Sequence, residues 1–164
     1  MIDKQYLMST ELLVALYHRN FPKVRDLLSE LGDPDAKLDT FLHSAVHIAV
    51  ILKDSDLLKF LVRSCGCQID TGDVNGWSPL GYMAIEGDPE NNWLARFLVR
   101  LGADVHYSTR ESNYESPLDF AKDKQEDNAE LYTYFRRIRD APFLWERRRL
   151  ALLARTRIGN VTLI

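Results

Sequence analysis

The sequence has few cysteines and no long apolar run. Only two of its 164 residues are cysteine, too few for the disulfide framework of a small secreted domain. No stretch approaches the roughly 18 apolar residues that a membrane-spanning helix needs. The first residues carry charges of both signs without an apolar signal core. We therefore expect an intracellular protein, cytoplasmic or nuclear, without a membrane as its partner.

The sequence also lacks the short motifs of common catalytic sites. It contains no Gly-x-Ser-x-Gly, no phosphate-binding glycine-rich loop and no His-Glu-x-x-His. Cys65 and Cys67 form a single Cys-x-Cys pair, whereas a zinc site needs about four ligands. We therefore expect no enzyme activity, no metal, no cofactor and no small-molecule substrate. The two thiols are interpreted as an inert pair at a helix end.

Charge is unevenly distributed along a chain whose formal net charge is −3. Residues 142–164 contain five Arg and one Glu, a local charge of +4. Residues 1–141 contain 16 basic and 23 acidic residues, a local charge of −7. Because an acidic surface repels phosphate backbones, we do not expect nucleic acid as a partner of the main body.

Three serines mark an internal repeat. Ser44, Ser78 and Ser116 each precede a short apolar segment, and the second interval is only slightly longer than the first. A second segment follows each of the first two, with apolar residues at three- and four-residue steps, a spacing that places them on one helical face. Counting back about 33 residues from Ser44 gives a degenerate first copy that starts near Glu11.

Local signals predict that each copy is a pair of helices. Ser78 can cap a helix start, and Pro79 falls at the first helical position, where no N–H is needed. Gly87 and Gly102 lie where the two helices of this copy must end. Residues 73–76, which contain Asn-Gly, predict a turn before the copy.

The whole pattern resembles the ankyrin repeat: Thr-Pro-Leu-His, a helix, Gly, a second helix and Gly-Ala-Asp. The resemblance covers roughly residues 10–140. It implies an all-α fold, a solenoid of stacked helix-turn-helix units with hairpin loops and an added C-terminal helix. The implied copies span about residues 11–43, 44–77, 78–115 and 116–141.

Several positions depart from this pattern. The second copy has Ala45 and Lys53 where Pro and Gly are expected. Its start has an alternative at residues 40–43, but only Ser44 gives the usual distance to the second helix. His47 occupies the position at which the family's histidine links loops by hydrogen bonds, so the resemblance implies a structural role for it. Atypical first and last copies fit a solenoid whose ends meet water.

The resemblance implies a non-enzymatic protein-protein interaction module, expected to be a monomer. A protein partner would bind on the concave side, along the hairpin tips and the first helices, with Trp77 and Phe41 as anchors. An alternative reading is that some of these side chains pack on neighbouring hairpins. The implied contact residues are His18, Arg19, Phe41, His43, Ile51, Leu52, Val74, Asn75, Trp77, Ile85, Glu86, Ser112 and Asn113.

Residues 142–164 predict a basic amphipathic helix that starts at Pro142 and ends at Gly159. The simplest interpretation is a cap over the open apolar end of the last repeat. Two alternatives stay open, a helix that docks a second protein and a helix that binds an anionic surface. Either would make the chain an adaptor with the repeats as its handle.

Overall fold

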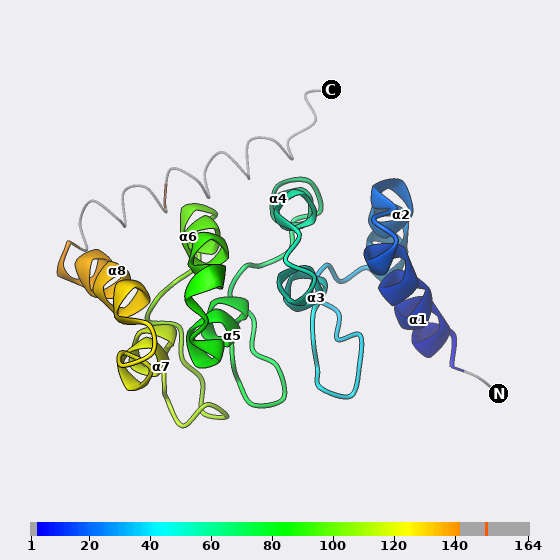
Figure 1. Ribbon diagram of the computed structural model, residues 1–164. Coiled ribbons are helices and arrows are strands. Elements are labelled where there is room, and N and C mark those ends of the chain that lie inside the picture. Colours follow the sequence, from blue (N-terminus) through cyan, green and yellow to red (C-terminus); the bar gives the residue numbers. More distant parts are fainter. Residues whose placement is uncertain (1–2, 142–149, 151–164) are drawn as a thin grey trace.

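The structure, a computed structural model, describes residues 3–141 and residue 150. This part of the chain forms four helix pairs in a row and contains no strand (Figure 1). The all-α repeat fold expected from the sequence is confirmed. The elements are α1 (Lys4–Tyr17), α2 (Phe21–Leu31), α3 (Ala45–Ile51), α4 (Ser55–Ser64), α5 (Pro79–Glu86), the 3-10 helix η1 (Pro89–Asn91), α6 (Asn92–Arg100), α7 (Pro117–Asp123) and α8 (Ala129–Asp140).

The second helices α2, α4, α6 and α8 line one side of the row, and three long loops extend from the opposite side (Figure 1). The first helices α1, α3, α5 and α7 lie between them. None of the described helices is long and apolar enough to cross a bilayer. The cap or docking helix predicted over residues 142–164 falls almost wholly outside the described residues.

The three serine anchors precede α3, α5 and α7, so the start chosen at Ser44 is correct. The Ser78 hydroxyl accepts the Gly81 N–H at 3.1 Å. In the last repeat the Asp119 carboxylate accepts the Ser116 N–H at 2.9 Å. Asp119 stands where the family has His, and it completes a reciprocal helix cap instead.

One backbone position explains why Lys53 can replace the expected glycine. Arg19, Lys53 and Gly87 occupy the same position in three successive repeats, and each has a left-handed φ, of 54°, 53° and 65°. Each follows directly on a first helix or its last turn and redirects the chain toward the second helix. The turn geometry is therefore common to three repeats, and two of them accept the strain of a side chain at that position.

The first helix is longer than the repeat pattern predicts. It begins at Lys4 rather than near Glu11, and the Asp3 carboxylate caps it by accepting the Gln5 N–H at 3.1 Å. The repeat period, counted back from Ser44, predicts only the part of the helix that matches the other copies. The period does not predict the turns before Glu11, because nothing in the repeat pattern requires them.

Apolar side chains from both helices of every pair form one continuous core. The fully buried members include Leu12, Leu57, Leu80 and Phe135, one from each helix pair. A single pair of about 33 residues cannot bury its own apolar face, so each pair depends on its neighbours. Buried amides also join the pairs: Asn92 and Asn128 exchange hydrogen bonds of 3.0 and 2.8 Å.

When each long loop is counted with the helix pair that follows it, as it is from here on, His47 joins the second repeat to the third. Its Nδ1 accepts the Ser44 N–H at 3.2 Å, and its Nε2 lies 3.0 Å from the Trp77 carbonyl oxygen. Because a carbonyl only accepts, Nε2 donates and the ring is neutral. Burial lowers the pKa of His47 to about 4, since a charged ring would be poorly solvated there.

This pKa predicts acid sensitivity. The unfolded chain takes up a proton on this ring below about pH 6.5, whereas the folded protein resists until about pH 4. The unfolding free energy should therefore fall by about 2 kcal/mol between pH 7 and pH 5 through this group alone. Denaturant titrations at the two pH values measure the loss.

His47→Gln should be less stable at pH 7 but should have a flatter pH dependence. His18→Gln is the matched control, because it makes the same substitution at an exposed histidine beside the end of α1. An equal slope in wild type and His47→Gln would contradict the assignment.

Candidate functional site

The long loops form a row of tips that are hydrogen-bonded to one another. The Val74 N–H donates to the Phe41 carbonyl at 2.8 Å, which joins the first loop to the second. The Thr109 hydroxyl donates to the Gly76 carbonyl at 3.3 Å, which joins the second loop to the third. These bonds make one connected surface from segments that belong to successive repeats.

Aspartates shape the tips in two successive repeats. Asp73 Oδ1 accepts the N–H groups of Asn75 and Trp77 at 2.8 and 2.9 Å, and Gly76 N–H donates to the Asp73 carbonyl at 3.0 Å. The turn predicted over residues 73–76 is therefore confirmed. Asp39, at the same position of the preceding repeat, accepts the N–H groups of the residues two and four positions after it in the same way.

A network of hydrogen-bonded polar side chains lies directly behind these two tips. His43 Nδ1 is 2.7 Å from Asp39 Oδ2, and His43 Nε2 is 2.8 Å from the Tyr82 hydroxyl. The Tyr82 hydroxyl donates to Asp73 Oδ2 at 2.7 Å. Burial, and then the bond to Asp73, raise the pKa of Tyr82 and keep its proton in place. This polar network fixes both tips relative to α5.

Burial opposes ionisation of Asp39, but hydrogen bonds from His43 outweigh it and hold the pKa of this carboxyl below its usual value. The carboxylate is therefore charged at neutral pH and acts as an acceptor. It shapes the first tip in the same way as Asp73 shapes the second.

Large apolar side chains are exposed on the tips and at the end of α3. Phe41 is 60% exposed, and Ile51 and Val74 are each 45% exposed. Sequence reasoning named these three but missed Leu42 and Tyr114, which are 42% and 71% exposed. Both have a positive φ, of 58° and 63°, and the repeat pattern gives no signal for that.

The expected contact residues differ in exposure. Two are buried, so the expectation that their side chains face solvent is corrected. His43 belongs to the polar network behind the tips, and the Ser112 hydroxyl donates within its own loop, where it lies 3.0 Å from the carbonyl oxygens of Thr109 and Glu115. Leu52, Trp77 and Ile85 are half-buried. The exposed members are His18, Arg19, Phe41, Ile51, Val74, Asn75, Glu86 and Asn113.

Two of the expected contact residues also hold repeats together. The Arg19 guanidinium lies 2.6 Å from Asp54 and 3.4 Å from Asp56, which joins the first repeat to the second. The Trp77 ring packs edge-on against Tyr82 and Phe120, with centroid separations of 6.0 Å in each case. Trp77 is therefore part of the contact between the third and fourth repeats.

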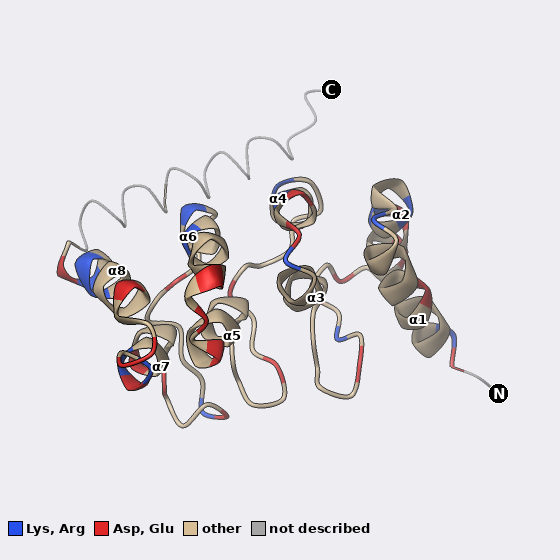
Figure 2. Ribbon diagram, in the orientation of Figure 1, with Lys and Arg blue, Asp and Glu red and all other residues tan. Residues whose placement is uncertain are grey.

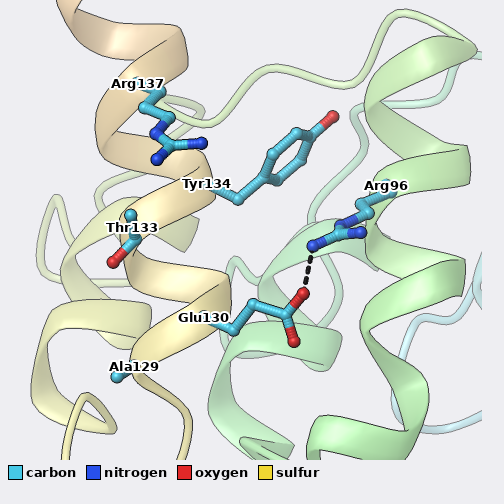
Figure 3. A pocket seen from close by; sticks show the side chains of 6 residues that line it. All are labelled: Arg96, Ala129, Glu130, Thr133, Tyr134 and Arg137. Carbon is cyan, nitrogen blue, oxygen red and sulfur yellow. Dashed lines mark hydrogen bonds and ion pairs between the residues drawn. The ribbon is translucent and has the colours of Figure 1, made fainter.

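A surface pocket of about 330 Å³ lies on the other side of the row, between α6 and α8 (Figure 3). Arg96 forms an ion pair with Glu130, and its guanidinium carbon is 5.3 Å from the centroid of the Tyr134 ring. These contacts hold the third and fourth repeats together. They account for Arg96 and Glu130, two of the charged groups that line the pocket, without a ligand.

The two cysteines also have a structural role. Cys65 ends α4, and the Cys67 thiol donates to the Pro34 carbonyl at 3.2 Å. Burial raises the pKa of both thiols, so little reactive thiolate forms at neutral pH. No cluster of three or more metal-ligating side chains occurs within residues 3–141.

Residues 12–109 match the family model for ankyrin repeats, with three copies. The chain belongs to the ankyrin repeat family. Ankyrin repeats are in general protein-protein interaction modules and are typically non-enzymatic. No curated protein matches the chain significantly. The pair α7 and α8 follows the matched residues and extends the same stack of repeats.

The contact between neighbouring tips requires glycine at position 76. Gly76 has φ +76°, and an added Cβ would lie 2.7 Å from the Ser112 nitrogen and against the Thr109 hydroxyl. Gly76→Ala should therefore lower the unfolding free energy by about 2 to 3 kcal/mol, through backbone strain and the clash together. Thermal or denaturant unfolding measures the change.

Gly32→Ala is the control for strain alone. Gly32 has a similar φ of +70°, but nothing lies within 4 Å of an added Cβ, so the expected cost is about 1 kcal/mol. Equal losses in the two variants would show that the tips do not constrain each other.

Proposed function

We propose that this protein is a non-enzymatic interaction module that binds a protein partner through its hairpin tips and first helices. The main support is the exposure of large apolar side chains on a surface whose backbone is held by hydrogen bonds. Phe41 is 60% exposed although its carbonyl is bonded to the neighbouring tip. Aromatic side chains on a rigid frame lose little entropy on binding and commonly dominate interface energies.

Charge supports the same side and indicates the chemistry of the partner. The four second helices contain nine basic and five acidic residues. The remaining described residues, in the first helices and loops, contain seven basic and eighteen acidic residues. Figure 2 shows this separation, with acidic residues along the loops and basic residues on α6 and α8. A partner for the loop side should therefore carry positive charge, which would speed association at low salt.

Within this surface Phe41 and Val74 are the anchors that the proposal favours. Their main chains are bonded to each other, so the two side chains project from adjacent tips. Ile51, Ile85 and Glu86 extend the surface along the first helices, at the ends of α3 and α5. Trp77 contributes its accessible edge, and its other contacts support the fourth repeat.

The test is the double variant Phe41→Ala/Val74→Ala. Quantitative affinity capture should identify proteins whose recovery falls at least about tenfold relative to wild type, because losing two anchors costs roughly 1.4 kcal/mol or more. The melting temperature should change by only a few degrees, since neither side chain is part of the buried core.

Trp93→Ala is the matched control, because Trp93 is 48% exposed but lies on α6 among the second helices. It should retain the same captured proteins. The proposal fails if the double variant retains them all, or if Trp93→Ala removes the same set.

A further inference from the structure

The first helix has two apolar faces, of which the described chain covers one. Leu12 and Leu16 are fully buried against the stack. On another side of the same helix, four large apolar side chains are more than half exposed. They are Tyr6 at 70%, Leu7 at 52%, Val14 at 52% and Tyr17 at 57%. At 100° per residue they fall within one third of the helix circumference, together with Thr10.

The repeat pattern shows what this face is built to contact. Val14 corresponds to Ile48 and Tyr82, which occupy the same position in the next two repeats. Ile48 is 3% exposed, and the Tyr82 hydroxyl reaches His43 on the loop of the preceding repeat. The position therefore faces the preceding repeat in the stack. Within the described residues α1 lies at the end of the row, so Val14 has no such neighbour (Figure 1).

No charged residue of α1 lies on the exposed face, and Asp3, which directly precedes the helix, accepts the Gln5 N–H at 3.1 Å as its cap. Lys4 lies 3.3 Å from Glu30, and Glu11 lies 3.5 Å from Lys23. A molecule that covers the face therefore buries no unpaired charge. This matters for self-association, because residues 1–141 carry a charge of −7 and other parts of the surface would repel a second copy.

The face is also nearly symmetric about its midpoint. Tyr6 and Tyr17 lie at its two ends, with Leu7 and Val14 between them. If α1 of a second copy packs antiparallel, Tyr6 of each copy lies near Tyr17 of the other, and the interface has the twofold symmetry of a homodimer. We propose that two copies of this chain associate through α1, each covering the stacking face of the other. The proposed dimer differs from the monomer expected at first, because the sequence does not show which apolar side chains of α1 are exposed.

The area involved sets the strength of the dimer. Four large side chains that are half exposed or more provide roughly 400 Å² of surface per copy, about half of a standard interface. The pair should therefore be weak and concentration-dependent. Sedimentation equilibrium of the full chain should show a mass of 18.9 kDa at low micromolar concentration. The mass should rise toward twice that value at a few hundred micromolar.

Leu7→Glu/Val14→Glu should remain monomeric over the same range, because each carboxylate would be buried without a partner. Trp93→Glu, at an exposed apolar residue on α6, is the control and should dimerise as wild type does. Circular dichroism shows whether each variant is folded. Hydrogen exchange at high concentration should protect α1 in wild type more than in the double variant.

A wild-type mass of 18.9 kDa at every concentration would overturn the proposal and leave the face to another protein. A dimer that survives the double substitution would overturn it as well. So would a dimer whose protected amides lie on the loop tips instead of α1. A monomer at every concentration would not affect the partner surface around Phe41, which a separate variant tests.

Discussion

In the described part of the chain, hydrogen bonds that pass from one repeat to the next satisfy buried polar groups of the second, third and fourth helix pairs, and the fold depends on them. The His47 ring reaches the Trp77 carbonyl, and the Asn92 and Asn128 amides bond to each other. An unpaired polar group left in these positions would cost about 1 to 3 kcal/mol. The apolar core requires close stacking, and these bonds fix the register in which the repeats stack.

The same bonds determine where the tips lie. His47 holds the start of α3 against Trp77, which directly follows the second tip. The polar network that runs from Asp39 through His43 and Tyr82 ends on Asp73, at the base of that tip. A partner would therefore meet a surface whose conformation is set by the stack behind it. Solenoid stability and surface geometry are properties of one hydrogen-bond network, so weakening a repeat contact also moves the surface.

Local sequence signals predicted the parts of this structure that depend on neighbouring residues. Serine caps, the turn over residues 73–76 and the start at Ser44 all follow from chemistry within a few positions. The burial of His43 could not be predicted in this way, because its partner Tyr82 lies in the next repeat, far away in sequence. The turns of α1 before Glu11 were missed because the repeat period carries no information about residues outside the repeat.

The loop tips and the exposed face of α1 differ in the physical reason for their exposed apolar side chains. On the tips, Leu42 and Tyr114 adopt a positive φ, which is unfavourable for large side chains and turns them away from any core. The exposure of these two side chains is a consequence of tip geometry. On α1 the backbone is an ordinary helix, and Val14 is exposed because its repeat is the first in the described row. Removing strain would alter the tips, whereas only another stacked surface can bury the face of α1. The two surfaces can therefore be occupied independently, because contact through α1 extends the row at one end and leaves the loop side open to a partner.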